Sequence, residues 1–183
     1  MSYRVVGFGG TASEHSSSKT ALSYVLHAAA KEGATTELIE ARGLDLPIYG
    51  SVQSDLRAQD FAERVHAADA LVISSPLYHG SISGLIKNAL DWLELLASRS
   101  PAYLSDKPVG LIAVAGGSQS LMAIQTLENV VRALRGWPIP YVVPIDRAGA
   151  VFGRRGEILD EDVGRRLDLL ASEVVRAAGV FKR

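Results

Sequence analysis

Strand-like segments without polar alternation recur along this chain, and they constrain its fold more than any other feature. They span residues 3–8, 36–40, 70–74, 109–115 and 141–144. A strand that is apolar on both faces has to be covered on both faces, which is typical of a parallel sheet. The pattern therefore predicts an α/β fold with five parallel strands.

Segments with helical spacing separate these strands, because their apolar residues recur every three or four positions. The expected helices span residues 19–31, 55–68, 82–96, 121–134 and 160–178. In the last of them, Asp160 suits the N-cap and Gly179 suits the position just after the end. The helix at 82–96 is apolar over more than one stripe, and this surplus suggests an interface between subunits.

A five-stranded parallel sheet fits two strand orders. One is a truncated Rossmann sheet, and the other is the flavodoxin-like three-layer sandwich with order 2-1-3-4-5. In the second order, ligands bind where the loops after strands 1 and 3 meet. These loops are rich in Gly, Ser and Thr, so we expect the flavodoxin-like order and a ligand at that place.

Size and charge narrow the possible functions. The chain has 183 residues, 48% of them hydrophobic, and a net charge of −1, which fits a single domain over residues 1–183 without nucleic-acid binding. It has no cysteine, and its four histidines lack metal-ligand spacing, so we expect no thiol chemistry and no metal. The absence of a signal peptide and of a membrane-length apolar run predicts a cytoplasmic protein with no membrane partner.

The loop after the first strand is rich in hydroxyl groups. Between residues 9 and 20 they belong to Thr11, Ser13, Ser16, Ser17, Ser18 and Thr20. Hydroxyls and open N–H groups at a helix N-terminus form a site for an anion such as phosphate, and Lys19 adds a cation. The same residues suit an ordinary loop with a serine N-cap, so this loop alone leaves both interpretations open.

Two phosphate motifs fit this loop poorly. Residues 7–12 match G-x-G-x-x-A, the dinucleotide fingerprint, but the polar loop continues well past the place where that motif opens its helix. Residues 18–20 resemble the end of a Walker A loop, but Ser13 and Ser18 stand where that motif requires glycine. We therefore reject a nucleoside triphosphatase.

The loop after the third strand, residues 76–84, is neutral and suits a flat ligand. Pro76 disfavours helix at the residue before it and fixes a turn, and Gly80 lets the backbone approach a ligand closely. A second neutral loop, residues 115–120, follows the fourth strand and is expected to flank the same ligand. We find no nucleophile or carboxylate pair in either loop, so no catalytic side chain is expected.

The residues of the third-strand loop resemble the NADPH-dependent FMN reductase family. From Pro76 to Trp92 the chain matches the family pattern P-x-Y-x-G-S-x-x-G-x-[IL]-K-N-x-x-D-W at every specified residue. The first loop is similar to the family signature G-S-x-R-x-x-S-x-[NST], although Ser13 stands where the family carries arginine. The resemblance covers roughly residues 3–145.

The resemblance implies that FMN binds at the carboxyl edge of the sheet, where the flavin N5 atom does the chemistry. The implied cofactor-binding residues are Gly10, Thr11, Ser16, Ser17, Ser18, Pro76, Leu77, Tyr78, His79, Gly80, Ser81, Gly116, Gly117 and Ser118. His15, in the first of these loops, is a further candidate contact.

The resemblance also implies an FMN-dependent NAD(P)H oxidoreductase. Hydride would pass from NADPH or NADH to FMN and then on to a flavin, quinone, azo compound or metal ion. Family members are dimers or tetramers, so a homodimer or homotetramer is expected. Members that hand reduced flavin to a monooxygenase partner can carry an inserted tyrosine after strand 4, and residues 121–134 contain none, which favours retained FMN.

Two alternatives remain at this stage. A flavodoxin-type electron carrier would bind FMN without reductase activity of its own, but such carriers are usually strongly acidic. A Rossmann dehydrogenase would bind NAD directly and contact an acidic residue after strand 2, for which Glu40 is the candidate.

Overall fold

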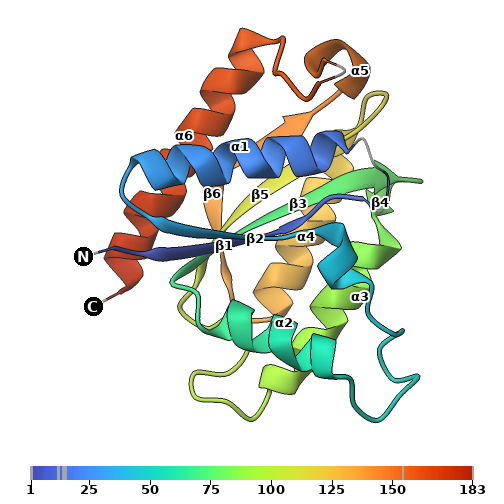
Figure 1. The fold of residues 1–183 in the computed structure, drawn as a ribbon, viewed down its shortest axis with the longest axis vertical. Helices are drawn as coiled ribbons and strands as arrows, with labels where there is room; N and C mark the ends of the chain where they lie inside the picture. The colour runs from blue at the N-terminus through green and yellow to red at the C-terminus, as the bar shows by residue number, and fades with distance from the viewer. Residues whose placement is uncertain (1, 12, 14–15, 154, 183) are drawn as a thin grey trace.

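The computed structural model describes residues 2–11, 13, 16–153 and 155–182. Its strands are β1 (Arg4–Gly9), β2 (Thr35–Ile39), β3 (Ala70–Tyr78), β4 (Ser81–Ile82), β5 (Pro108–Val114) and β6 (Trp137–Ile145). The sheet order is β2-β1-β3-β5-β6, all parallel, and the short β4 pairs antiparallel with the end of β3 (Figure 1). The five parallel strands thus have the predicted 2-1-3-4-5 order, and the Rossmann order is wrong.

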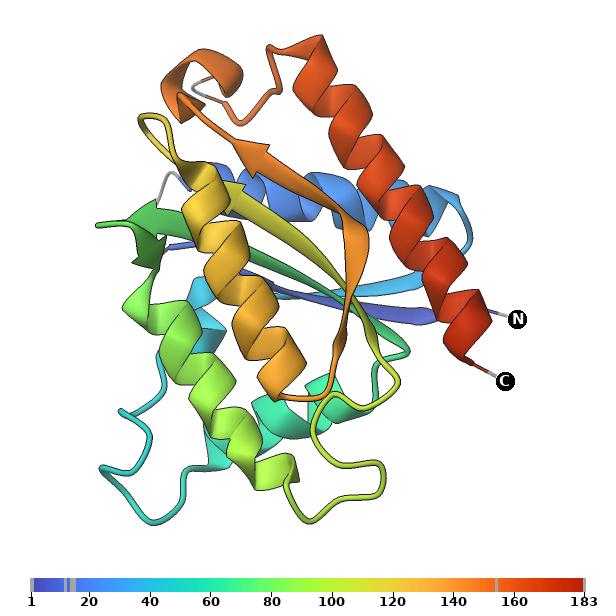
Figure 2. The same ribbon diagram turned by 180° about the vertical axis from the view of Figure 1, so that it is seen from behind.

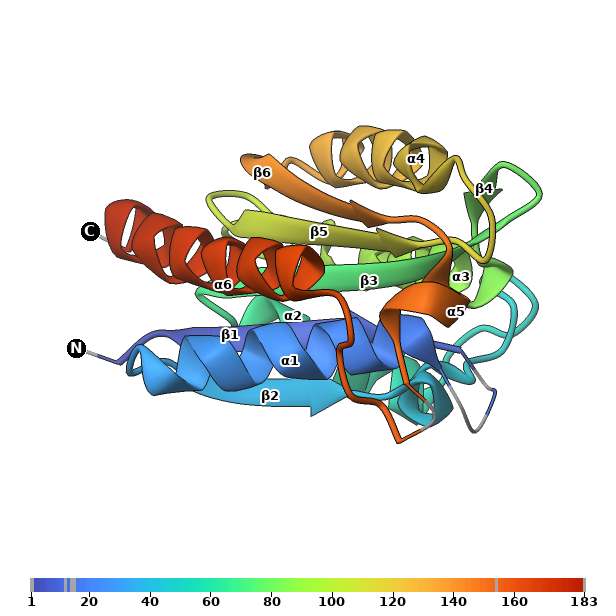
Figure 3. The same ribbon diagram turned by 90° about the horizontal axis from the view of Figure 1, so that it is seen from above.

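Helices cover both faces of the sheet, as the predicted three-layer sandwich requires. One face carries α1 (Ser17–Lys31), α5 (Ala148–Val151) and α6 (Glu161–Phe181), and the other carries α2 (Leu56–His66), α3 (Gly84–Trp92) and α4 (Ser120–Ala133) (Figure 3). Figure 2 shows the second face, with α4 crossing in front of the strands. Short 3-10 turns follow β2 at Ala41–Leu44 and α3 at Leu93–Leu96.

Apolar side chains fill both layers between the helices and the sheet. One cluster joins the strands to α2, α3 and α4, and in it the rings of Phe8 and Phe61 meet edge to face with centroids 5.2 Å apart. The other joins the strands to α1 and α6. The neighbours Val72 and Ile73 belong to different clusters and are both fully buried. Strands that lack alternation are therefore confirmed as covered on both sides.

Most of the surplus apolar residues expected at a subunit interface are buried within the chain, and Leu95 is the exposed one, at 39%. The segment 82–96 divides into the end of β4, then α3 and a 3-10 turn. Its residues Ile86, Leu90, Leu93 and Leu96 are at most 1% exposed and belong to the cluster shared with α2 and α4. These four residues pack against neighbouring elements of the same chain and give no support to an interface, which stays a prediction.

The C-terminal helix begins as predicted but ends later. Asp160 caps α6 by accepting hydrogen bonds from two N–H groups of its first turn. The helix passes through Gly179, whose prediction as a stop is wrong, and continues to Phe181, which packs on Trp137 with ring centroids 5.5 Å apart. A Cβ at Gly179 would lie 3.0 Å from the Tyr3 hydroxyl. This glycine therefore makes room for a neighbouring side chain and does not terminate the helix.

The last strand is longer than the expected segment 141–144. β6 begins at Trp137 and contains a register shift opposite β5. Pro138 and Pro140 hid its first half, because proline lacks the N–H of a central strand, but β6 is an edge strand and tolerates proline there. Among the described residues, no helix is both long enough and apolar enough to cross a membrane.

Candidate functional site

The chain after β1 passes very close to β3 at Ser74, the middle residue of that strand. A Cβ at Gly9 would lie 2.1 Å from the carbonyl oxygen of Ser74, so only glycine fits this close approach. Gly10 follows with φ +98° and donates its N–H to the same oxygen at 3.3 Å. The chain thereby turns from β1 toward the start of α1 while it stays bonded to the neighbouring strand.

Ser16 and Ser18 hold this loop together from inside. The Ser16 Oγ caps α1 by accepting from the N–H of Lys19 at 3.2 Å, and it also accepts from the N–H of Thr11 at 3.1 Å. The Ser16 and Ser18 hydroxyls lie 3.1 Å apart, and the Ser74 hydroxyl donates to the carbonyl of Ser18. Both serines are therefore buried structural residues of the site.

The start of α1 contributes mainly backbone donors to the site. In the first turn of α1, the N–H of Lys19 is capped by Ser16 and the N–H of Thr20 bonds to the Ser16 carbonyl. Helical geometry leaves the N–H groups of Ser17 and Ser18 without an intrahelical acceptor. Together with the hydroxyls of Thr11 and Ser17, they form an open end that suits an anion. His15, a candidate contact, lies outside the described residues.

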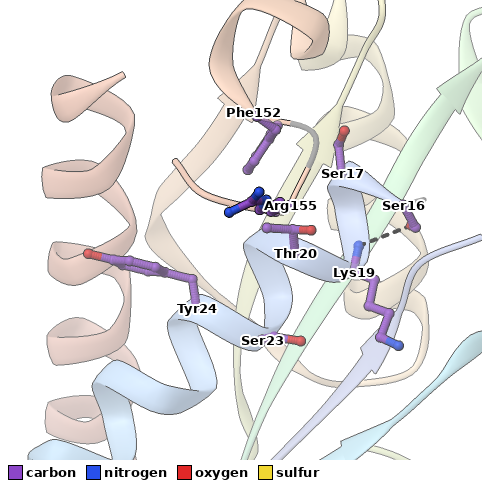
Figure 4. Close-up of a pocket in the computed structure, with 10 residues that line it drawn as sticks. Ser16, Ser17, Lys19, Thr20, Ser23, Tyr24, Phe152 and Arg155 are labelled. Atoms are coloured by element: carbon purple, nitrogen blue, oxygen red, sulfur yellow. Dashed lines mark hydrogen bonds between the residues drawn. The ribbon is translucent and has the colours of Figure 1, made fainter. Parts of the chain in front are cut away.

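The cation expected beside this loop is already paired. Lys19 Nζ lies 2.9 Å from a carboxylate oxygen of Glu40, just after β2. In Figure 4 the Lys19 side chain points away from Ser17 and Thr20. The pairing also occupies Glu40, the residue that the Rossmann alternative reserved for a ribose.

The predicted loop at residues 76–84 is instead a tight hairpin. β3 continues to Tyr78, which pairs with Ser81 of β4, and the two turn residues His79 and Gly80 have φ values of 49° and 82°. Two successive positive φ values are typical of a two-residue hairpin turn. The prediction that Pro76 forms the turn is wrong. Pro76 lies within β3 beyond the end of β1, where one edge of β3 is unpaired and a missing N–H is tolerated.

Two buried serines that the sequence analysis did not select support this hairpin. The Ser75 Oγ accepts from the N–H of Ser83, which ties the returning chain to β3 at 3.1 Å. The Ser83 Oγ then caps α3. Hydroxyl residues inside or beside an otherwise apolar strand were the available signal, because buried hydroxyls need partners.

The third loop, Gly116 to Ser118, is exposed and anchored by the chain that follows β6. The N–H of Arg147 donates to the carbonyl of Gly117 at 2.7 Å. A carboxylate oxygen of Asp146 accepts from the N–H of Ser120 at 2.9 Å and so holds the start of α4. This hydrogen bond lowers the pKa of Asp146. Asp146 was missed from the sequence, where an acidic residue directly after the fifth strand was the signal.

The three loops meet at one edge of the sheet, because β1, β3 and β5 are neighbours and run parallel. Pro76 lies opposite Val114 at the end of β5. A Cβ at Gly80 would lie 3.3 Å from the Met122 methyl group, so the hairpin tip contacts the start of α4. Tyr78 is 51% exposed at this edge. The structure thus brings the predicted residues of all three loops to the predicted switch point.

A cleft of about 620 Å³ lies beside the open end of α1. One wall is the face of α1 that carries Ser17, Thr20 and Ser23, and the other is the chain after α5, with Phe152 and Arg155 (Figure 4). Within the described part of the chain, no three His, Cys, Asp or Glu residues are grouped closely enough to hold a metal ion. The site therefore offers neutral donors and an arginine.

A family model for NADPH-dependent FMN reductase matches residues 3–150, which include all three loops. The chain belongs to this family. A related FMN-dependent NADPH-azoreductase from Staphylococcus haemolyticus is 45% identical over 94 residues, which are 51% of this chain and 46% of that protein. The chain thus spans about half the length of the curated relatives it matches.

Solved structures agree on the fold. An oxidoreductase from Corynebacterium diphtheriae superposes with a TM-score of 0.76 and 19% identity over 98% of each chain. The NAD(P)H:(acceptor) oxidoreductase FerB from Paracoccus denitrificans gives 0.73 and 19%, over 97% of this chain and 98% of its own. At these identities the likeness supports the flavodoxin-like fold alone.

Proposed function

We propose that this protein is an FMN-dependent NAD(P)H oxidoreductase whose single domain, residues 1–183, binds FMN at the carboxyl edge of its sheet. The observation that carries the proposal is the meeting of three loops at the switch point, where both family patterns lie. The open N–H groups of α1, the neutral hairpin and the exposed loop at Gly116 fit a ligand with one anionic end and one flat, uncharged end.

Each loop has a separate part in this proposal. The N–H groups of Ser17 and Ser18, with the hydroxyls of Thr11 and Ser17, would bind the phosphate. Tyr78 to Ser81 and Gly116 to Ser118 would flank the ring and direct backbone N–H groups at its polar edge, where charge grows on reduction. Bound FMN supplies the hydride chemistry itself, so these residues bind and orient and need not exchange protons.

The nucleotide and the electron acceptor would both bind at the exposed edge of the sheet where the three loops meet. NADPH or NADH would donate the hydride, and a small planar acceptor would then take the electrons. An azo compound or a quinone is the acceptor class we favour, because relatives that match over 46% of their length or less are named azoreductases. Free flavin and metal ions remain further acceptors to assay. The flavodoxin-type carrier is the less favoured alternative, since the chain belongs to a reductase family.

We also propose that the molecule is a homodimer or homotetramer that retains its FMN. Tyr78, Leu121 and Met122 are 41–51% exposed beside the proposed ring site, and a second copy could cover them. α4 is a regular helix without an inserted tyrosine, which favours retention over delivery to a monooxygenase. Light scattering tests the assembly, and gel filtration of the FMN-loaded protein tests retention.

Spectroscopy tests the central proposal. Purified protein is mixed with FMN, passed through a desalting column and examined in the visible range, then treated with NADPH or NADH without oxygen. We expect the flavin to stay bound to the protein. Either nucleotide should bleach it within the turnover time, and an azo dye should then reoxidise it. Bleaching much slower than turnover would favour the electron carrier, and a colourless protein would refute FMN binding.

A further inference from the structure

The cleft beside α1 holds an arginine that comes from a distant part of the chain. Arg155 lies after α5, yet it lines the same cleft as Ser17 and Thr20 of α1 (Figure 4). The segment approaches α1 closely, since a Cβ at Gly156 would lie 3.6 Å from the Thr20 hydroxyl. Arg155 is therefore placed beside the open end of α1 by the tertiary fold.

The segment that carries Arg155 is anchored on both sides. Phe152 is 9% exposed, belongs to the core cluster and forms an antiparallel bridge with Ile158. The N–H of Gly153 bonds to the carbonyl of Glu157 at 2.9 Å. The Glu157 carboxylate accepts from the backbone N–H of Arg155 at 2.9 Å, so this acidic group bonds to the backbone of the turn. The guanidinium lies on an exposed residue of a braced turn.

The first loop itself has little positive charge to offer an anion. Lys19 is paired with Glu40, and Ser13, where the family carries arginine, is neutral and exposed. A phosphate at the N–H groups of Ser17 and Ser18 would be bound more tightly with a cation beside it, because a charged donor binds a dianion more strongly than neutral ones do.

We propose that Arg155 supplies this cation and pairs with the FMN phosphate, in place of the arginine that position 13 lacks. The inference rests on the proposed function, because it assumes that FMN is the ligand. The segment after α5 lies outside the loops of the family pattern. The proposal gives this segment a part in selecting a phosphorylated flavin. A guanidinium suits this role because its planar donors match two phosphate oxygens at once.

The test compares FMN with riboflavin, which has the same ring but no phosphate. Dissociation constants for both are measured by flavin fluorescence on the wild-type chain, R155A and R155K. We expect R155A to weaken FMN binding by about 10-fold or more, the loss of a hydrogen bond to a charged group, and to leave riboflavin binding within about twofold. R155K should fall between, since lysine keeps the charge but loses the paired donors.

A matched control is R57A, which removes an exposed arginine from α2 on the opposite face of the sheet. It should change neither constant. Equal losses for FMN and riboflavin in R155A, or no loss for either, would overturn the role of Arg155 while leaving the proposed function intact. A wild-type chain that binds both flavins equally would do the same. A wild-type chain that binds neither would remove both proposals.

Discussion

The loop after β1 and the hairpin formed by β3 and β4 are both held by buried serines, but they differ in the residues that they expose. In the first, Ser16 and Ser18 are at most 8% exposed and bond to the loop itself. In the second, Tyr78 and His79 face solvent. In the loop after β1, the buried serine hydroxyls hydrogen-bond within the loop and hold its backbone in place. Such a loop can therefore present backbone N–H groups to a ligand.

Glycine substitutions give the largest expected contrast, between the loop after β1 and the exposed loop at Gly116. A Cβ at Gly9 would meet the Ser74 carbonyl at 2.1 Å, whereas one at Gly116 would meet nothing within 4 Å. We expect G9A to lower the free energy of unfolding by about 3 kcal/mol or more, through overpacking against backbone, and G116A to change it by less than about 0.5 kcal/mol. Denaturant unfolding of both variants measures the difference, and equal effects would contradict the close approach.

Serine substitutions sharpen the comparison at a smaller scale. S16A removes the cap of α1 and the acceptor of the Thr11 N–H, so we expect a loss of about 1–2 kcal/mol in unfolding free energy together with weaker FMN binding. S118A, on the exposed loop, should leave stability within about 0.5 kcal/mol. The same unfolding assay with and without FMN separates the two. If S16A unfolds like the wild type, Ser16 is not part of the loop's framework.

Asp146, beside the loop proposed to flank the flavin ring, should make the stability of the protein depend on pH in the acidic range. Its pKa is lowered by the hydrogen bond from Ser120, so it contributes stability above the pKa of an unfolded aspartate, about 4, and loses it as the pH falls through the lowered value. D146A should cost at most about 1 kcal/mol at neutral pH, because the group is largely solvated. The gap to the wild type should close in acid.

D146N is the matched control for that titration. Asparagine keeps an oxygen that accepts from the Ser120 N–H but cannot ionise. Thermal unfolding is followed from neutral to acidic pH. The stability of D146N should be close to that of the wild type at neutral pH, and its pH dependence should lack the contribution of Asp146. A constant gap between D146A and the wild type at every pH would argue against a titrating cap.

The fold was predictable where hydrophobic pattern alone decides it. Apolar strands such as 70–74 and 109–115 have to be covered on both faces, and this requirement predicted the layers. The loops rich in Gly, Ser and Thr after the first and third strands then favoured the strand order that the structure confirms. Boundaries failed where the environment outweighs local preference. Gly179 stays helical because Tyr3 packs over it, and Pro138 lies in a strand because that strand is at an edge.

The candidate site was predictable in its location but less so in its detail. Residue types and the family patterns led to the three loops, and these loops lie together. The Lys19–Glu40 pair joins residues 21 positions apart, and the approach of Arg155 to Thr20 joins residues well over a hundred positions apart. No local pattern encodes such distant partners, so only the folded chain reveals which cation stays available.

Substitution of Lys19 should have the smallest effect on FMN binding, and it tests which cation binds the phosphate. Its salt bridge to Glu40 lies at the surface, with both side chains 40–49% exposed, and such pairs contribute about 0–1 kcal/mol. Because the charge is neutralised there, K19A should weaken FMN binding by less than about threefold. Its control is K87A, which removes a lysine paired with Asp91 on α3. A loss in K19A as large as the one expected for R155A would mean that Lys19 leaves Glu40 and becomes the phosphate cation, and the two loops would then differ less than their contacts indicate.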